Sequence, residues 1–357
     1  MMRKLLFLIF LLSSGLLNAQ KSTISGYVKE ASSGEGLIGA SVYVKELKTG
    51  NVTNTYGFYS LTLPAGKYTL VFSSSGFKKR EQAVDVAAKS QEISVELVAD
   101  SQELAEVIVK ARANDENVRG IEMSVNKVDI KTIRKIPALL GEVDLVRAIQ
   151  LLPGVSTVGE GASGFNVRGG GVDQNLVLLD DAPVYNSSHL FGFFSVFNPD
   201  AVKDVKLFKG GIPSMYGGRA SSILDVKMKE GNAKKLEVNG GVGVIFSRLS
   251  IEAPIVKDKA SFIVAARRSY IDVLAKPFLT GNNANSKFSF YDLTAKVNYT
   301  INQKNTVFMS GYFGRDVFGT GFGFDWGNTT LTTRWNHVFS NKLFLNATAF
   351  YSNYDYM

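Results

Sequence analysis

Cysteine is missing from this chain, and histidine and tryptophan are scarce: the 357 residues contain no Cys, two His and two Trp. Without cysteine neither a disulfide nor a thiolate metal site can form, so burial and hydrogen bonding alone must hold the domains together. Two histidines also argue against a transition-metal site, and we expect neither a metal nor any other cofactor. Beyond the N-terminus no apolar run reaches the roughly 20 residues that a membrane-spanning helix needs. Any entry into a membrane would therefore use strands closed into a barrel.

Glycine and aromatic residues are abundant, with 34 Gly, 24 Phe and 14 Tyr. This mixture is typical of proteins with many short strands, glycine turns and aromatic belts. The formal net charge of +8 is spread along the chain without a polybasic block. We interpret it as a solvated, mildly basic surface rather than a nucleic-acid site, and we expect no nucleic-acid partner.

Residues 1–20 have the organisation of a secretory signal peptide. The positive pair Arg3-Lys4 precedes the uncharged apolar run Leu5–Leu12, and Ala19 offers a small residue for cleavage. We expect cleavage after Ala19 or Gln20 and export from the cytoplasm. No cysteine follows that could carry an N-terminal lipid anchor.

Residues 21–99 alternate between apolar and polar with a period of two, which predicts half-buried strands. About seven such runs with turn signals between them predict a small β-sandwich without helices. The turns are expected at Ser33-Gly34, Thr49-Gly50-Asn51, Pro64-Ala65-Gly66 and Ser75-Gly76. The predicted core positions are Ile24, Gly26, Val28, Val42, Val44, Tyr59, Leu61, Leu63, Tyr68, Leu70, Phe72, Ile93, Val95 and Leu97.

The order of motifs in this segment resembles the carboxypeptidase regulatory-like domain. The motifs are Gly26-Tyr27-Val28, Glu35–Val42, Thr53–Leu61 and Leu63–Tyr68. The resemblance implies a transthyretin-like sandwich that has no catalytic residues of its own. A docking module and an independently folding spacer both remain open as its role.

Residues 100–120 form a polar, charged linker that is interrupted by the short β-prone run Leu104–Val109. Such a segment is suited to strand addition, in which its backbone pairs with the edge of a partner's sheet. The alternative is that it forms the first strand of the next domain.

Residues 121–232 mix helix and strand patterns, which predicts a small α/β domain. A helical stripe begins near Leu145 with Asp144 as its N-cap and ends at Pro153-Gly154. Strands are expected over Phe165–Arg168, Gln174–Leu179, Val202–Lys209 and Ile223–Met228.

No catalytic constellation stands out in this region. The glycine run that begins at Gly169 lacks the Gly-Lys-Ser/Thr ending of a phosphate loop. Asp180 and Asp181 are consecutive, so on a strand they would point to opposite faces and could not act as an acid/base pair. In a turn, Asp is favoured for local hydrogen bonds to the backbone. We therefore expect that the chain is not an enzyme.

The same region resembles the plug domain of TonB-dependent outer-membrane receptors. The motifs occur in the plug order as Phe165–Gly170, Asn175–Tyr185, Phe197–Gly211, Met215–Ala220 and Ile223–Val226. Within them, the plug-motif positions are Arg168, Gly169, Gly170, Asp180, Gly210, Tyr216, Gly217 and Arg219. The resemblance makes Glu106, Val107, Ile108 and Val109 the expected TonB box, which would lie in the periplasm and be captured by strand addition.

The aromatic segment Tyr185–Phe194 lies between the plug motifs. One interpretation is an apex loop that meets the ligand through Tyr185, His189, Phe191 and Phe193, because aromatic rings suit sugars and other amphipathic ligands. The alternative, which we favour, is packing within the plug or against a barrel.

Residues 233–357 show longer runs of alternation, which predict the first strands of a transmembrane barrel. We expect about six strands, near 236–251, 259–270, 288–301, 304–316, 328–340 and 342–355. Lys296 should face the lumen, because a lysine at the bilayer midplane costs about 2–4 kcal/mol. Plug-holding transporters have about 22 strands, so we expect the barrel to be incomplete and the chain to be a fragment. A soluble sandwich with both faces half buried is the alternative.

Together these features predict an outer-membrane, TonB-dependent receptor for energy-coupled nutrient import. The implied partners are a TonB-type energising inner-membrane complex, outer-membrane lipid and a nutrient ligand such as a glycan or siderophore. A surface lipoprotein, common in the glycan-importing branch, is left open. The alternative function is a cell-surface signalling or adhesion protein that uses the sandwich for docking.

Overall fold

A computed structural model describes residues 21–87, 89–100, 125–128, 130–133, 143–159, 164–280, 286–320 and 322–357. They form two compact units. In these ranges no helix is both long enough and apolar enough to cross a bilayer. The expected signal peptide and TonB box lie outside the described residues.

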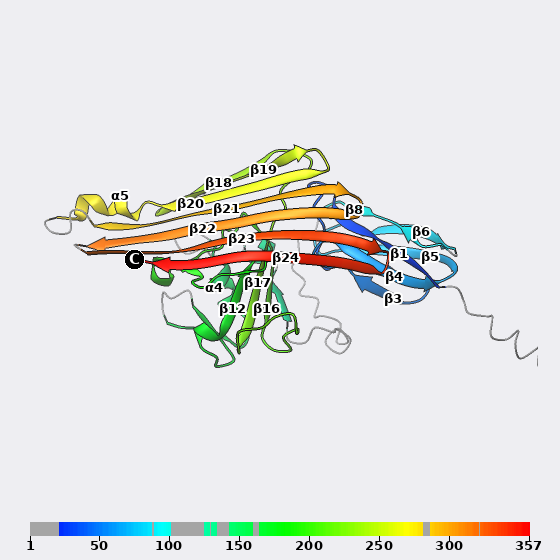
Figure 1. Ribbon diagram of the computed structural model, residues 1–357, viewed down its shortest axis with the longest axis horizontal. Coiled ribbons are helices and arrows are strands. Elements are labelled where there is room, and N and C mark those ends of the chain that lie inside the picture. Colours follow the sequence, from blue (N-terminus) through cyan, green and yellow to red (C-terminus); the bar gives the residue numbers. More distant parts are fainter. Residues whose placement is uncertain are drawn as a thin grey trace, which may run out of the picture. The chain divides into compact units, whose positions relative to one another are not determined.

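Eight short strands build the N-terminal unit (blue to cyan in Figure 1). One sheet has the order β4-β1-β7, with β8 also paired to β1, and the other has the order β3-β2-β5-β6. The strands are β1 (Lys21–Glu30), β2 (Ser41–Val44), β3 (Thr49–Val52), β4 (Phe58–Pro64), β5 (Gly66–Ser73), β6 (Arg80–Val86), β7 (Gln91–Glu92) and β8 (Val95–Leu97). The predicted small β-sandwich is confirmed.

The core of this unit consists largely of the apolar positions that alternation predicted. Most of them are no more than 8% exposed, and the Tyr59 hydroxyl donates a 2.8 Å hydrogen bond to the carbonyl of Ile93. These buried residues are Ile24, Val28, Val42, Val44, Tyr59, Leu61, Leu63, Leu70, Phe72, Val95 and Leu97.

The turn predicted at Thr49-Gly50-Asn51 is wrong. These residues belong to strand β3, and the turn lies at residues 45–48, where Lys48 has φ 49°. A Cβ atom on Gly50 would lie 2.6 Å from the carbonyl oxygen of Val42. Glycine is needed here because two strands approach closely, not because the chain reverses.

A five-stranded mixed sheet forms the framework of the α/β domain, in the order β13-β12-β17-β16-β9. Its central strand β17 (Ser222–Met228) is buried along its whole length. The other strands are β9 (Val125–Val128), β12 (Asn175–Leu179), β13 (Ala182–Pro183) and β16 (Val202–Phe208). Helix α4 (Leu145–Gln150) packs into the same core. The predicted N-cap is confirmed, because the Asp144 side chain accepts a hydrogen bond from the backbone N–H of Arg147.

Smaller elements complete the α/β domain. They are α3 (Ile130–Ile133), β10 (Val155–Thr157), β11 (Phe165–Val167), η3 (Val172–Gln174), β14 (Ser188–His189), η4 (Leu190–Gly192) and β15 (Phe194–Ser195).

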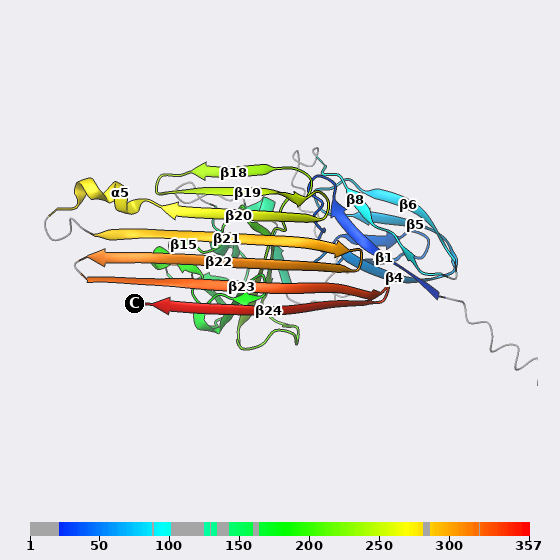
Figure 2. The ribbon, with the colours of Figure 1, turned by 45° about the horizontal axis from the view of Figure 1, so that its top comes forward.

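Seven antiparallel strands follow in sequence order and form what we call the wall sheet (Figure 2). They are β18 (Glu237–Val242), β19 (Phe246–Val256), β20 (Ala260–Ser269), β21 (Lys287–Asn302), β22 (Asn305–Thr320), β23 (Phe322–Ser340) and β24 (Leu343–Tyr356). Helix α5 (Ile271–Ala275) and the turn η5 (Lys276–Phe278) lie between β20 and β21.

The single strand predicted over residues 236–251 is wrong: it is a hairpin of β18 and β19. Val242 pairs with Ser247, and the N–H of Gly243 donates to the carbonyl of Phe246 across the turn. The turn at residues 243–246 interrupts an otherwise continuous alternating pattern.

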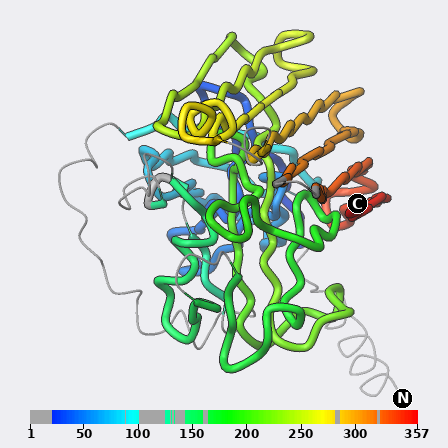
Figure 3. Tube along the Cα trace, turned by 90° about the vertical axis from the view of Figure 1, so that its left-hand side faces the viewer, coloured from blue at the N-terminus to red at the C-terminus, as the bar shows by residue number. Residues whose placement is uncertain are grey.

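The wall sheet has its polar face buried and its apolar face exposed, the reverse of a water-soluble sheet. On β21, Leu293 and Ile301 are 45% and 51% exposed, whereas Asp292 and Lys296 are 2% and 5% exposed. The prediction that Lys296 faces inward is confirmed. The sheet curves around the α/β domain, which covers its polar face (Figure 3). The alternative prediction for this segment, a soluble sandwich with both faces half buried, is therefore wrong.

Candidate functional site

The first contact between the α/β domain and the wall sheet is made by the turn that follows strand β12. Asp180 and Asp181 occupy this turn with φ of 49° and 75°, left-handed values that Asp tolerates better than most residues. The Asp180 carboxylate lies 2.8 Å from the ammonium of Lys296, and its other oxygen accepts a 3.0 Å hydrogen bond from the N–H of Met228.

Asp181 continues the same network. Its two oxygens contact Lys227 of β17 and Arg334 of β23, and the Lys227 ammonium also lies 3.1 Å from Asp225. Burial alone would raise the pKa of the Asp180 carboxyl, but the charges of Lys296, Arg334 and Lys227 hold it well below its usual range. The two Asp side chains are thus held by basic partners, and they do not form an acid/base pair. Their hydrogen bonds are long-range rather than the local ones expected for a turn.

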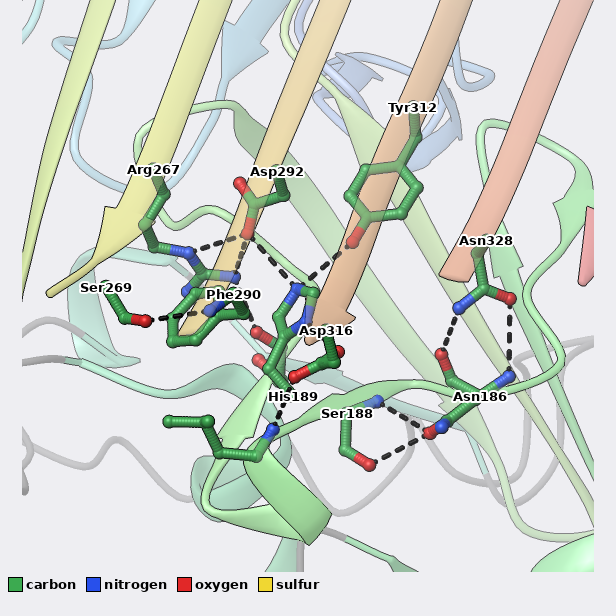
Figure 4. Close-up of polar contacts among 12 residues, drawn as sticks. Asn186, Ser188, His189, Arg267, Ser269, Phe290, Asp292, Tyr312, Asp316 and Asn328 are labelled. Carbon is green, nitrogen blue, oxygen red and sulfur yellow. Dashed lines mark hydrogen bonds and ion pairs between the residues drawn. The ribbon is translucent and has the colours of Figure 1, made fainter. Parts of the chain in front are cut away.

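The second contact is centred on His189 of strand β14 (Figure 4). Its Nδ1 atom lies 2.7 Å from Oδ2 of Asp316, and its Nε2 atom lies 3.2 Å from Oδ2 of Asp292. The Tyr312 hydroxyl is also 3.2 Å from Nε2. The imidazole stacks on Phe290 with ring centroids 4.4 Å apart and is 2% exposed.

Arg267 of β20 completes this cluster. Its guanidinium donates to Oδ2 of Asp292 through Nε at 2.8 Å and through an Nη atom at 2.7 Å. The same Nη atom donates to the carbonyl of Ser195 in the α/β domain. Burial by itself lowers the pKa of His189, but its hydrogen bonds to Asp292 and Asp316 raise it above the ordinary value.

Next to His189, the chain displays an aromatic side chain in a strained turn. Leu190 and Phe191 have φ of 49° and 57°, left-handed values that cost about 1–3 kcal/mol each in residues other than glycine. Phe191 remains 58% exposed although its ring packs near Trp326, at 5.0 Å between centroids. Phe318 and Phe324 also lie within 6.0 Å of the Phe191 ring.

The four residues predicted to face a ligand are divided by the structure. Tyr185, Phe191 and Phe193 are 57%, 58% and 49% exposed. His189 is instead buried at the contact with the wall sheet, where it is held by carboxylates. In this loop the packing interpretation therefore applies to His189, and three neighbouring rings remain accessible.

The plug-motif positions do not converge on one site. Arg168 and Gly169 form a left-handed turn after β11, and a Cβ on Gly170 would lie 2.3 Å from the side-chain oxygen of Ser221. Tyr216 donates a 3.1 Å hydrogen bond to Asp225. Gly210 and Gly217 lie in loops, and the Arg219 guanidinium donates to the carbonyl of Gly218 at the surface. Of this set, Asp180 alone takes part in the contacts with the wall sheet described above.

Sequence reasoning did not single out several residues of the two clusters. A signal for them exists: each is a charged or polar residue within a strand whose outward face carries apolar side chains. A charge on the inner face of such a strand needs a buried partner. The residues in question are Arg267, Asp292, Tyr312, Asp316 and Arg334. Among the described residues, no group of His, Asp and Glu is arranged to hold a metal ion.

A wall of strands with an apolar outer face is thus ion-paired through its polar face to an α/β domain. Two family models match the chain. Residues 24–109 match the CarboxypepD_reg-like domain, and residues 117–222 match the TonB-dependent Receptor Plug Domain. The chain is thus similar to the TonB-dependent receptors, and we call its α/β domain the plug, because most of it lies in the segment that matches their plug model.

Curated relatives include the TonB-dependent receptor SusC of Bacteroides thetaiotaomicron, which is 28% identical over 242 residues, 63% of this chain and 23% of that protein. The TonB-dependent receptor P3 of Formosa agariphila is 24% identical over 310 residues, 81% of this chain and 29% of that protein. The chain thus spans about a quarter of the length of these relatives.

Solved structures that match part of this chain include the siderophore receptor PirA from Pseudomonas aeruginosa, with a TM-score of 0.48 and 18% identity over 66% of this chain and 42% of that one. The alcaligin receptor FauA from Bordetella pertussis has a TM-score of 0.49 and 16% identity, over 65% of this chain and 39% of that one.

Proposed function

We propose that this chain is part of a receptor that imports a nutrient across the outer membrane with energy supplied by a TonB-type complex. The observation that supports this most strongly is the inverted wall sheet. A sheet that exposes leucine and isoleucine while burying Lys296 and Asp292 is built for hydrocarbon on one side and a polar filling on the other. The plug occupies the polar side.

Import would proceed by mechanical coupling. The ligand, a nutrient such as a glycan or a siderophore, binds above the plug, and the energised partner pulls on the segment Glu106–Val109 after pairing with it as an added strand. The plug then yields a path along the polar face of the wall. No covalent change to the ligand is involved, because Asp180, Asp181 and His189 serve as contacts between plug and wall.

The location follows from the same proposal. Residues 1–20 direct export and are removed, the wall lies in outer-membrane lipid, and the sandwich and TonB box are periplasmic. N-terminal sequencing of the mature protein tests the first point: a sequence that begins at residue 20 or 21 supports it, and an uncleaved Met1 contradicts it.

Deletion of Glu106–Val109 in the complete gene tests the coupling. A panel of polysaccharides and ferric chelates, each supplied as the sole carbon or iron source, first identifies a substrate whose uptake needs the intact gene. The deletion should then abolish uptake and leave binding of that substrate to whole cells intact. Deletion of the equally long Arg112–Asp115 is the matched control and should have little effect. Unchanged uptake in the Glu106–Val109 deletion would contradict the assignment of these residues as the TonB box.

A further inference from the structure

The His189 cluster is electrically balanced in only one protonation state of the imidazole. Asp292 and Asp316 contribute two negative charges and Arg267 contributes one positive charge, all at positions that are at most 3% exposed. With a neutral imidazole, a buried negative charge is left without a partner, which is strongly unfavourable. With an imidazolium, the charges sum to zero.

The contacts of His189 with the two carboxylates favour the same state. Each ring nitrogen of His189 faces a carboxylate oxygen, Nδ1 that of Asp316 and Nε2 that of Asp292. An ionised carboxylate only accepts hydrogen bonds, so both nitrogens must carry a proton for both contacts to be favourable. The Tyr312 hydroxyl, the remaining titratable group at the ring, can accept from Nε2 as well.

The same carboxylate also holds the strained turn. Oδ2 of Asp316 contacts the His189 ring, while Oδ1 accepts a 2.8 Å hydrogen bond from the N–H of Leu190. Leu190 and Phe191 adopt left-handed backbone conformations that persist only when the surroundings impose them. The contacts of Asp316 with His189 and Leu190 therefore determine where the exposed Phe191 ring is displayed.

We propose that His189 is a positioning residue of the loop Ser188–Ser195, and that its second proton is what fastens this loop to strands β21 and β22. When the proton is lost, the lone pair of the imidazole faces a carboxylate, the charge balance fails, and the strained turn is released. That this loop faces a ligand rests on the proposed function. The proton-dependent attachment of the loop to the strands does not depend on that function.

The direction of the pH effect follows from the cluster. Burial lowers the pKa of His189, but its hydrogen bonds to Asp292 and Asp316 outweigh burial and place the pKa above the ordinary value of about 6.5. The attachment is thus complete below that ordinary value and is lost as the pH rises through the higher pKa of the folded protein. The loop should be released in alkaline rather than acidic solution.

Electron paramagnetic resonance tests this, since nitroxide mobility does not itself depend on pH. The chain has no cysteine, so Phe193→Cys provides a single labelling site in the half-exposed part of the loop. The complete receptor, with any cysteine beyond these residues replaced, is labelled in lipid vesicles and measured between pH 5 and pH 10. The label should be immobilised at acidic pH, and a mobile component should grow as the pH rises.

Two variants separate this mechanism from general loosening. His189→Gln should give a mobile label at every pH. Asp316→Asn should remove the pH dependence and keep the label immobilised, because the charges then balance with a neutral imidazole, which accepts from the new amide. A second label at the exposed Met215, in another plug loop, should not change with pH.

The proposal is overturned if the wild-type spectrum is constant over this pH range, if His189→Gln leaves it unchanged, or if the label at Met215 becomes mobile together with the label at Phe193. These spectra need neither ligand nor TonB. A failed uptake experiment with the expected spectra would therefore count against the transport function alone, and constant spectra would count against the role of His189 alone.

Discussion

The ammonium of Lys296 on strand β21 lies 2.8 Å from a carboxylate oxygen of Asp180 in the plug, and the two side chains are 4% and 2% exposed. Both residues also contact the backbone of Met228: Lys296 donates to its carbonyl at 3.3 Å, and Asp180 accepts from its N–H. A wall residue and a plug residue thus meet at one point of strand β17, which fixes the plug against the wall.

Replacing Lys296 with Met should destabilise the plug strongly. Removing one partner of a buried ion pair costs about 3–5 kcal/mol, and here the Asp180 carboxylate would lose its nearest cation while Arg334 and Lys227 remain close. Calorimetric unfolding of the purified receptor should show this as a lower transition temperature of the plug. The double variant Asp180→Asn with Lys296→Met should recover most of the loss. A single variant as stable as the wild type would show that the pair is not buried as described.

Acid should loosen the same contact over a defined range. The basic groups around Asp180 lower the pKa of its carboxyl despite burial. The stability that this provides is complete above the ordinary Asp pKa of about 3.9 and is lost as the pH falls toward the lower pKa of the folded state. The transition temperature should therefore hold down to about pH 5 and decline below it. Asp180→Asn should make that decline shallower, and an unchanged decline would point to other carboxylates.

Arginine substitutions on the outer face of β21 should differ in cost with depth. Leu293 lies near the middle of this strand and Ile301 near its end, and both are exposed on the apolar face. Leu293→Arg should cost about 2–4 kcal/mol of unfolding free energy in lipid vesicles, and Ile301→Arg about 0–1 kcal/mol. Denaturant titration of the two variants checks this. Equal costs would contradict the membrane depth assigned to the strand.

Local patterns predicted most of the strands because each buried face alternates with a period of two. The predictions failed where a local signal had a long-range cause. Gly50 was read as a turn signal, but glycine is required there because strand β2 approaches closely. The turn that begins at Gly243 was missed because the alternation of apolar and polar residues continues through it. Strand β9 was not predicted.

The site was less predictable than the fold for a physical reason. The inward direction of Lys296 follows from the cost of exposing a charge to lipid. Its partner Asp180 is more than a hundred positions away in the sequence, and His189 is equally remote from Asp292 and Asp316. Pairing between a plug turn and a strand depends on how the two pack, and no periodicity within either segment encodes it.

Trp326 and Trp335 provide the most direct test of the central claim that the wall sheet lies in lipid around the plug. They are nine positions apart on β23 and so lie on opposite faces; Trp335 is 42% exposed and Trp326 is 8% exposed. All tryptophans other than these two are first replaced in the complete receptor. In that background Trp326→Phe leaves Trp335 as the single fluorescent reporter, and Trp335→Phe leaves Trp326. In vesicles of lipid brominated near the headgroups, Trp335 fluorescence should be strongly quenched and Trp326 fluorescence should not. Equal quenching of both, or quenching of Trp326 alone, would contradict the account.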